Sequence, residues 1–299
     1  MAVVPVMLAP FVCDVGSRGL LKRMIMPNGV VAVSPRSERG ARRPSMVHSL
    51  GELRFPFEAT MLLLQALVHP WPHAAPGQGK VVMLIPGFMA GDMTLLPLAN
   101  FLRWLGHRPM FGGIWSNSDC PRLVLQRLGK RVEALNDQHS EPIVVIGQSL
   151  GGLYARELAH RHPELVERVV TLGAPIYAPR GSSNRAVLAM VRSMARLRGR
   201  ADGCLSETCT CGLELTQVRK EYAPTTVIYS RSDGVVHFDS CIDRSGSPLV
   251  DNVEVMGSHI GMGMNLEVYR VIVDRLMQPR DLRPRHSETR AIAAAPTVH

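Results

Sequence analysis

A serine between closely spaced glycines is the feature of this sequence with the clearest chemical meaning. It lies in the segment Gly147–Gly152, which reads GQSLGG, directly after the apolar run at 143–146 and directly before a helical pattern. A strand-to-helix turn this sharp strains the backbone of its serine and tolerates only small residues two positions to either side. The third glycine lets the helix approach the sheet. The pattern predicts that Ser149 is a nucleophile at the end of a strand; the alternative is a tight turn with an incidental serine.

Two residues further along the chain have the types and positions that a serine nucleophile needs. Asp233 follows the β-rich run at 225–229 and precedes a glycine, and His259 lies on a glycine-flanked loop after the run at 252–256. In proteins with this kind of serine turn, the acid and then the base come later in the chain, each on a loop after a strand. We therefore predict His259 as the general base and Asp233 as the acid that orients it.

Other residues compete for these two roles. An Asp-Gly pair is also a common turn, so Asp233 has a plain conformational interpretation. Asp239 and Asp243 are rival acids slightly farther beyond the strand end, and His237 and His160 are rival bases. His237 precedes the last predicted strand and His160 lies in the helix after the serine, so both positions suit a base less well.

A serine nucleophile also needs two backbone N–H groups directed at the oxyanion that forms on the substrate. Leu150, the residue after the serine, is the first candidate donor. The second is Phe88, in the glycine-rich turn Pro86–Asp92 that follows the apolar run at 80–85. The glycine before Phe88 lets the chain turn so that this amide faces the serine. The alternative is an ordinary loop between a strand and a helix.

The elements that position these residues alternate between strands and helices. Apolar runs with strand character lie at 80–85, 110–115, 142–146, 166–172, 225–229 and 252–256, and helical patterns lie at 57–69, 93–106, 121–139, 150–162 and 266–277. Such alternation, with strands that are apolar throughout, is typical of a mostly parallel, doubly wound sheet covered by helices. The fold class predicted from the sequence is therefore α/β.

The predicted domain is interrupted once and flanked by two tails. About fifty residues separate the fourth and fifth predicted strands, although a crossover helix needs only about a dozen. We predict that the excess, at about 177–222, forms a helical cap over the edge of the sheet. Residues 1–50 are expected to be a poorly ordered arm, residues 51–278 the main domain, and residues 279–299 a frayed tail.

The chain is basic, because Lys and Arg exceed Asp and Glu by 34 − 25 = 9. The excess is concentrated at 36–43, 180–200 and 280–290, without interleaved aromatic residues or a nucleic-acid-binding motif. We interpret it as a solvated basic surface and predict no nucleic-acid partner; an anionic partner is the alternative.

Six cysteines in a chain of this length do not form the framework of a small disulfide-stabilised protein. Cys204, Cys209 and Cys211 form a cluster in which reduced thiols are favoured over a disulfide, and no fourth zinc ligand stands nearby, so no metal is predicted. Residues 1–12 lack the pattern of a secretory signal, and the apolar run at 61–68 is too short to span a bilayer. We expect a soluble, cytoplasmic protein without a stable membrane span.

These motifs resemble those of the α/β-hydrolase superfamily, and in particular its bacterial lipase- and esterase-like members. The resemblance extends over 80–277 and rests on the serine turn, the Asp233 turn, the His259 loop and the turn at 86–88, where a proline stands in place of the family's histidine. The N-terminal arm and the cysteine-containing cap depart from the family pattern.

The resemblance implies a two-step acyl transfer in which Ser149 attacks an ester carbonyl and water then releases the acyl group. It implies no cofactor. Phe88, Met89, Leu95 and the cap would form an apolar acyl pocket for a small-molecule or lipid ester. An acyltransferase or a thioesterase would need the same catalytic triad. A catalytically silent hydrolase fold that acts as a binding module, and a charge-driven binder of nucleic acid or membrane, are alternatives from other classes.

Overall fold

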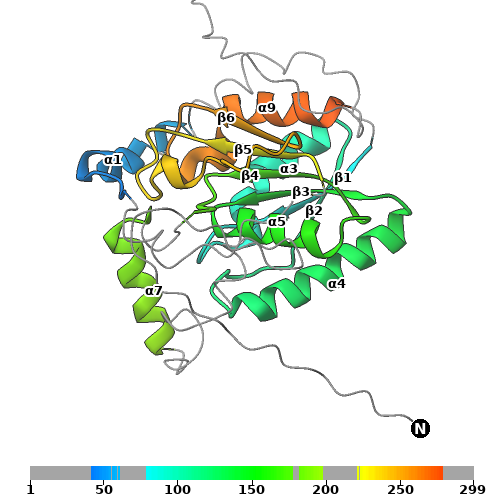
Figure 1. Cartoon of the computed structure of the whole chain (residues 1–299), viewed down its shortest axis with the longest axis horizontal. Coiled ribbons are helices and arrows are strands. Elements are labelled where there is room, and N and C mark those ends of the chain that lie inside the picture. The colour runs from blue at the N-terminus through cyan, green and yellow to red at the C-terminus, as the bar shows by residue number, and fades with distance from the viewer. Residues whose placement is uncertain are drawn as a thin grey trace, which may run out of the picture.

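A parallel sheet forms the centre of the protein. The computed structural model describes residues 42–54, 56–58, 60, 79–177, 182–197, 221 and 223–278. Within these ranges a six-stranded sheet has the order β2-β1-β3-β4-β5-β6, and each neighbouring pair is parallel (Figure 1). The strands are β1 (Val81–Ile85), β2 (Arg108–Phe111), β3 (Ile143–Gln148), β4 (Val166–Leu172), β5 (Thr225–Tyr229) and β6 (Val250–Glu254). The predicted α/β fold class is confirmed.

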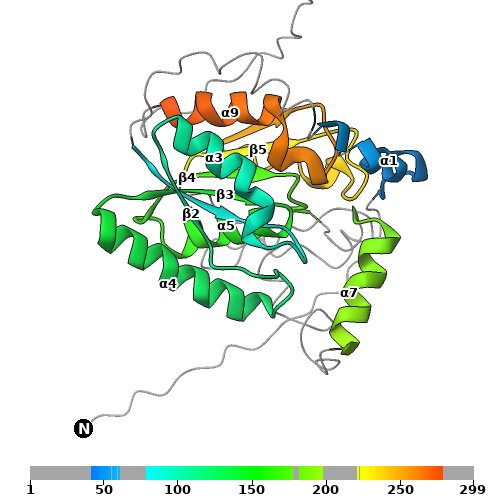
Figure 2. The same ribbon diagram turned by 180° about the vertical axis from the view of Figure 1, so that it is seen from behind.

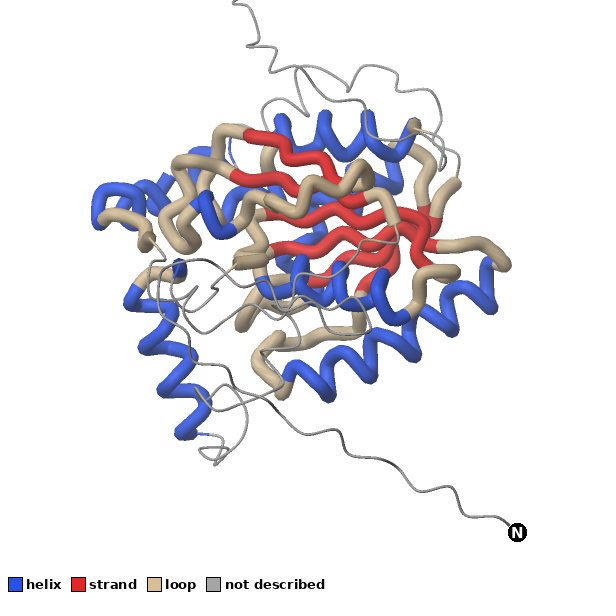
Figure 3. The backbone as a smooth tube through the Cα atoms, viewed as in Figure 1, coloured by secondary structure: helices blue, strands red, loops and turns tan. Residues whose placement is uncertain are grey.

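Helices cover both faces of this sheet. One face carries α3 (Leu96–Trp104) and α9 (Leu266–Met277), and the other carries α4 (Pro121–His139) and α5 (Leu150–Arg161), as Figures 1 and 2 show from opposite sides. Short 3-10 turns, η3 (Asp92–Leu95), η4 (Phe238–Ser240) and η5 (Ile260–Met264), lie in the connections. Figure 3 shows the resulting three layers, with the strands side by side between the helices.

Successive strand residues alternate between two hydrophobic clusters. In β1, Val82 and Leu84 join the cluster under α3 and α9, whereas Val81, Met83 and Ile85 join the cluster under α4 and α5. Side chains of a strand point alternately to its two faces, and both faces here are covered. This double burial explains why the central strands are continuous apolar runs in the sequence.

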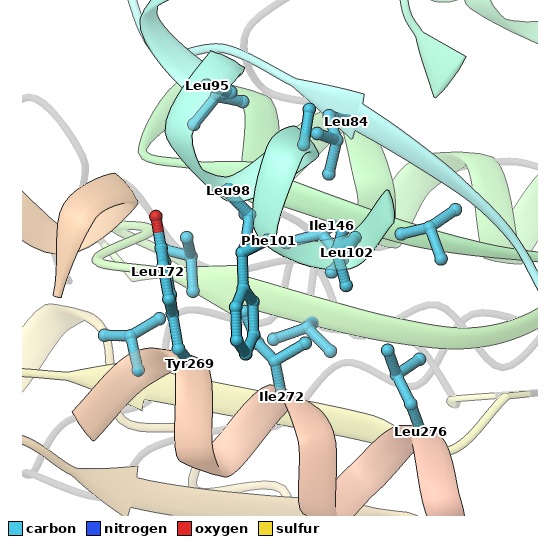
Figure 4. Packing of buried hydrophobic residues seen from close by; sticks show 14 of the residues in the cluster. Leu84, Leu95, Leu98, Phe101, Leu102, Ile146, Leu172, Tyr269, Ile272 and Leu276 are labelled. Atoms are coloured by element: carbon cyan, nitrogen blue, oxygen red, sulfur yellow. The ribbon is translucent and has the colours of Figure 1, made fainter. Parts of the chain in front are cut away.

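A stacked pair of aromatic rings links α3 to α9 in the core. The ring centroids of Phe101 and Tyr269 lie 4.6 Å apart with an interplanar angle of 18°, and Figure 4 shows the two rings side by side. The Tyr269 hydroxyl donates a hydrogen bond of 2.9 Å to the Gly263 carbonyl. The core therefore holds the η5 segment, which directly follows His259, in place.

Two predicted strands are shifted along the chain. The strand expected at 110–115 is β2 at Arg108–Phe111, since its first residue pairs with Val81 at the start of β1 and the chain turns at Gly113, whose φ is +76°. The strand expected at 252–256 is β6 at Val250–Glu254. Most of the helix predicted at 57–69 lies outside the described residues.

The end of the predicted N-terminal arm packs against the main domain. Helix α1 (Met46–Gly51) is capped by the Ser45 side chain and continues into η2 (Glu52–Arg54). The Ser49 hydroxyl donates a hydrogen bond of 2.9 Å to the Gly234 carbonyl, and α1 lies beside the loops after β5 and β6 (Figure 1). The structure thus differs from the predicted arm at 42–50, while residues 1–41 lie outside the described ranges.

The insertion after β4 contains a helix in the expected place. Helix α7 (Arg185–Leu197) lies beyond the strand ends, on the same side as α1 in Figures 1 and 2, and Ser183 forms an antiparallel bridge with Val236. Most of the rest of the predicted cap at 177–222, including the cysteine cluster, lies outside the described residues, as does the tail at 279–299. Of the two cysteines within the described ranges, Cys241 is a buried free thiol and Cys120 takes part in a disulfide. Among the helices described, none is long and apolar enough to cross a membrane.

A buried ion cluster fixes the point where the insertion returns to the sheet. Arg156 on α5 forms ion pairs with Glu221, which precedes β5, and with Asp243, at 2.7 Å, in the connection to β6. Both carboxylates are buried. Two buried carboxylates next to each other are stable as anions only while a cation lies between them.

Replacing Arg156 by leucine is expected to lower the free energy of unfolding by about 3–5 kcal/mol, because it leaves two buried charges without their cation. Urea denaturation measures this loss. Arg127→Leu is the control: Arg127 pairs with Asp119 on the surface, and such pairs contribute at most about 1 kcal/mol. Equal effects of the two substitutions would mean that the cluster does not hold the insertion in place.

Candidate active site

The serine turn has a strained backbone. Ser149 stands between β3 and α5 with φ of 52° and ψ of −119°, a conformation that non-glycine residues rarely adopt. A β-carbon on Gly147 would lie 2.2 Å from the Gly151 carbonyl oxygen, and one on Gly151 would lie 2.3 Å from the carbonyl oxygen of Ile85. Both glycines are therefore required by close backbone contacts, as the sequence pattern predicted.

The connectivity of the sheet explains where this turn lies. From β1 the chain goes to β2 on one side, and β3 pairs with β1 on the other, with Ile85 opposite Gly147. The loops after β1 and β3 therefore meet at the carboxyl edge of the sheet, where open α/β sheets bind their ligands. The turn at Pro86–Ala90, called the oxyanion turn below, begins directly beside the serine turn.

Asp233 and His259 form a buried pair. His259 Nδ1 lies 2.6 Å from Asp233 Oδ2, and both residues are less than a tenth exposed. The other oxygen, Asp233 Oδ1, accepts hydrogen bonds from the backbone N–H groups of Val235 and Val236 at 2.9 and 2.7 Å. With one carboxylate oxygen fixed by the backbone, the second is directed at the imidazole, whose remaining nitrogen Nε2 is left for a different partner.

The His259 loop and the serine turn are neighbours. The Gln148 side chain donates a hydrogen bond of 2.9 Å to the His259 carbonyl. The Ser149 N–H donates to the Leu172 carbonyl at 2.8 Å, and a β-carbon on the next residue, Gly173, would lie 3.0 Å from His259 Nδ1. Within the described part of the chain, this conformation contains no hydrogen bond between the Ser149 hydroxyl and the His259 ring. Catalytic hydrogen bonds are often long without substrate and tighten when it binds.

The two predicted oxyanion donors flank the serine. A β-carbon on Gly87 would lie 3.3 Å from the Ser149 β-carbon, so the oxyanion turn contacts the serine directly. Within the described ranges the Phe88 N–H donates no hydrogen bond. The Leu150 N–H is at the first position of α5, where an N–H group has no partner inside the helix. Both amides are thus available to a ligand beside Ser149.

Asn117 holds the oxyanion turn in shape. This buried residue donates from its side chain to the Pro86 carbonyl at 2.7 Å, and its backbone exchanges hydrogen bonds with Met89 and Ala90 at 2.9 Å each. Met89 has a φ of +59°, an unusual value for a residue with a side chain. Asn117 therefore adds to the turn's own hydrogen bond, from the Ala90 N–H to the Gly87 carbonyl at 3.1 Å.

Serine hydroxyls join the loop of Asp233 to the loop of His259. The Ser230 hydroxyl donates to the Gly257 carbonyl at 2.8 Å, and the Ser232 hydroxyl donates to the same carbonyl at 3.2 Å. These bonds hold the turn after β5 against the turn after β6, and so help to set the distance between Asp233 and His259.

Opposing effects act on the pKa of His259. Burial disfavours the charged imidazolium and lowers the pKa, whereas the Asp233 charge, the Asp233 hydrogen bond and the Glu52 charge raise it. The net direction is upward from the ordinary value of 6.5. A raised pKa makes this imidazole a stronger base than an isolated histidine.

The rival acids and bases have other partners. Asp239 pairs with Arg244, and Asp243 pairs with the buried Arg156. His237 caps η4 by accepting the Asp239 N–H, and burial lowers its pKa. His160 lies in α5, in the helix after the serine turn. The structure brings only Asp233 and His259 together among these candidates.

The two predicted substrate-contacting residues differ in their surroundings. Met89 is 37% exposed on the oxyanion turn, while Leu95, the last residue of η3, is 1% exposed and packs in the core. A β-carbon on Gly263 would lie 3.1 Å from Leu95, so Leu95 supports the segment after His259. An acyl pocket formed by these residues stays a prediction.

Four residues that support this site were not predicted from the sequence. Gln148 and Asn117 position the His259 loop and the oxyanion turn, and the carboxylates of Glu52 and Glu58 accept backbone N–H groups of the loops that carry Asp233 and His259. No local motif specifies the residue types at these positions, because their partners lie far away in the chain. Among the described residues, no group of three His, Cys, Asp or Glu side chains could hold a metal ion.

The sheet order, the strained serine turn and the covering helices define the α/β-hydrolase fold. A family model described as "alpha/beta hydrolase fold" matches residues 132–203, which contain β3, the serine turn and α5. No curated protein sequence matches the chain significantly.

Solved structures with related folds have low sequence identity to this chain. A monoacylglycerol lipase from Paleococcus ferrophilus is 15% identical, with a TM-score of 0.46, and the match covers 66% of this chain and 93% of the lipase. An esterase from Exiguobacterium antarcticum is 14% identical, with a TM-score of 0.46 and coverage of 68% and 93%. Alpha/beta hydrolase domain-containing protein 10 from mouse is 16% identical, with a TM-score of 0.45 and coverage of 67% and 89%.

Replacing Asp233 by asparagine is expected to lower the pKa of His259, because it removes the nearest negative charge and leaves the effect of burial. Proton NMR titration of the His259 ring measures the change, with the resonance assigned from a His259→Ala variant. Asp239→Asn is the control, since Asp239 pairs with Arg244 on the surface. A His259 pKa that is the same in wild type and Asp233→Asn would mean that the buried pair does not exist in solution.

Proposed function

We propose that this protein is a serine hydrolase that cleaves carboxylic esters through an acyl-enzyme on Ser149. The observation that carries the proposal is the buried Asp233–His259 pair on loops next to a strained serine that lies beside two available N–H groups. A plain strand-to-helix turn would have no use for a carboxylate–imidazole pair with a free Nε2 nearby. A catalytically silent binding module is disfavoured for the same reason.

In the proposed mechanism His259 Nε2 takes the proton of the Ser149 hydroxyl as its oxygen attacks the ester carbonyl. Asp233 holds the imidazole through Nδ1 and stabilises the imidazolium. The oxygen of the tetrahedral intermediate accepts hydrogen bonds from the Phe88 and Leu150 amides, which form the oxyanion hole. The imidazolium then protonates the departing alcohol, and a water molecule activated by His259 hydrolyses the acyl-enzyme. Apart from this water, the groups that act on the substrate belong to the protein.

The substrate class follows from the apolar residues at the rim. We assign Met89 to the acyl side of the site, because it lies on the oxyanion turn and is partly exposed. Leu95, the last residue of η3, is buried in the core. Helix α7 of the insertion would close the site from the other side. The proposed substrate is a small-molecule or lipid ester with an apolar acyl chain.

A related activity would use the same groups. With an alcohol in place of water as the acceptor, the protein would be an acyltransferase. With a thioester in place of an oxygen ester as the substrate, it would be a thioesterase. Neither change requires a different triad. The measured ratio of alcoholysis to hydrolysis separates transfer from hydrolysis.

The cytoplasmic location predicted from the sequence is retained as part of the proposal. The disulfide at Cys120 is an observation against it, because disulfides are rare in reducing compartments. Thiol counting on protein isolated under conditions that block exchange tests this point.

Purified wild-type protein is expected to hydrolyse p-nitrophenyl butyrate or palmitate, and Ser149→Ala is expected to lose activity by about 10⁴-fold or more. The reason is that no other described group can form the acyl-enzyme at this turn. Ser193→Ala, on the exposed side of α7, is the control. The butyrate-to-palmitate ratio separates an esterase from a lipase. An inactive wild type favours the binding module, and a fully active Ser149→Ala variant means that the nucleophile is another residue.

The pH dependence of kcat/KM has a predicted direction. His259 must be neutral to act as a base, so kcat/KM should rise with pH through the pKa of His259, which lies above 6.5. Asp233→Asn should move this rise to lower pH and reduce kcat by about 10⁴-fold, as a misoriented imidazole does in other serine hydrolases. A midpoint of this rise below pH 6.5 in the wild type would contradict the raised pKa.

A further inference from the structure

The N-terminal segment formed by residues 45–54 and 56–58 contacts both loops of the acid–base pair. We propose that this segment is part of the catalytic machinery and that Glu52 is a positioning residue, whose carboxylate fixes the loops of Asp233 and His259 relative to each other. The proposal rests on the function proposed above, and it adds a residue to that site for which the sequence has no motif.

One carboxylate bridges the two loops. Glu52 Oε1 accepts the N–H of Gly234, directly after the acid, at 2.8 Å, and the N–H of His259 itself at 2.9 Å. Glu52 Oε2 accepts the N–H of Ile260 at 3.1 Å. Hydrogen bonds from backbone N–H to a carboxylate are charge-assisted and about twice as strong as neutral ones. A single side chain thus ties the backbone of the acid to the backbone of the base.

A second carboxylate reinforces this bridge on the same loop. Glu58 accepts the Ser258 N–H at 2.9 Å and also the Ser258 hydroxyl. Arg54 forms an ion pair of 3.0 Å with Glu58 and donates a hydrogen bond of 2.8 Å to the Ser232 hydroxyl, in the turn of the acid. Consecutive amides at 258, 259 and 260 therefore all donate to carboxylates of the N-terminal segment.

Two glycines in these loops lie in close contact with the N-terminal segment. A β-carbon on Gly234 would lie 2.1 Å from the His48 carbonyl oxygen, and one on Gly261 would lie 1.8 Å from Glu58 Oε2. Neither glycine has a positive φ, so neither is needed for its own backbone conformation. Gly234 is required because the backbone of the N-terminal segment approaches so closely, whereas Gly261 leaves room for the carboxylate of Glu58. The backbone contact at Gly234 indicates that the docked arrangement is specific.

Glu52 acts on His259 through the backbone and through charge, without contact with the reacting atoms. Among the described residues, the charged groups that face the His259 loop are Asp233 from the turn after β5, Glu267 from α9, and Glu52, Glu58 and Arg54 from the N-terminal segment. The Glu52 charge raises the pKa of His259 together with Asp233. A displacement of about 1 Å between catalytic groups costs about 10²-fold in rate, so a fixed separation of the two loops matters for turnover.

The test compares Glu52→Gln with Glu254→Gln. Glu254 is exposed on β6, pairs with Arg231 and accepts no backbone N–H group of either loop, so it is a matched loss of one carboxylate. In Glu52→Gln we expect kcat for p-nitrophenyl butyrate to fall by about 10- to 100-fold with KM nearly unchanged. The rise of kcat/KM should also move to lower pH, and the His259 pKa from NMR should fall. Glu254→Gln should keep wild-type values.

Glu52→Asp keeps the negative charge, but its side chain is shorter and cannot reach both loops. It should therefore lower kcat while leaving the pKa of His259 close to that of the wild type.

The NMR titration requires no substrate and therefore separates this proposal from the proposed function. An inactive wild type would refute ester hydrolysis, while a lower His259 pKa in Glu52→Gln would still support the bridge. Wild-type kcat and wild-type His259 pKa in a folded Glu52→Gln variant would overturn the proposal. If circular dichroism shows that Glu52→Gln does not fold, Glu58→Gln takes its place, with the same fall in kcat expected, and wild-type kcat in that variant overturns the proposal.

Discussion

The structure depends on a contact between backbone atoms at the carboxyl edge of the sheet. Gly151 lies so close to the carbonyl oxygen of Ile85 that no side chain fits between them, and Gly147 approaches Gly151 in the same way. This packing is possible only because β1 and β3 are adjacent and parallel, with Ile85 opposite Gly147. The strained φ of Ser149 and its position beside the oxyanion turn both follow from this contact.

Much of the fold could be predicted because the local signals agree with one another. The bounds of α4, β4, β5 and α9 match the predicted ranges, since a buried parallel strand is apolar throughout and a covering helix has a clear period. The observed bounds of β2 are shifted from the predicted ones because the pairing of β2 with β1 decides where the strand begins, and this pairing is not encoded locally. The arm boundary differed because His48 and Ser49 lie against Gly234, which is far away in the chain.

The residues of the candidate site also fall into those that could be predicted from the sequence and those that could not. Ser149, Asp233 and His259 each follow a strand and precede or adjoin a glycine, so their positions have a local signature. Asn117 and Glu52 have none, since what makes them part of the site is a partner on another loop. Short motifs therefore predict the groups that would react, and the structure adds the groups that hold them. Such supporting residues are the ones that a search by motif cannot find.

The position of Glu52 in the chain has a consequence for how the protein is made. Its partners Gly234 and His259 lie 182 and 207 residues later, so the contacts of this side chain are among the most non-local in the fold. Non-local contacts form late, because a long loop must close before they give any stabilisation. A growing chain exposes the N-terminal segment first and can dock it only near the end of synthesis. The distance between Asp233 and His259 is therefore expected to be set in the last stage of folding, when the N-terminal segment docks on the loops after β5 and β6.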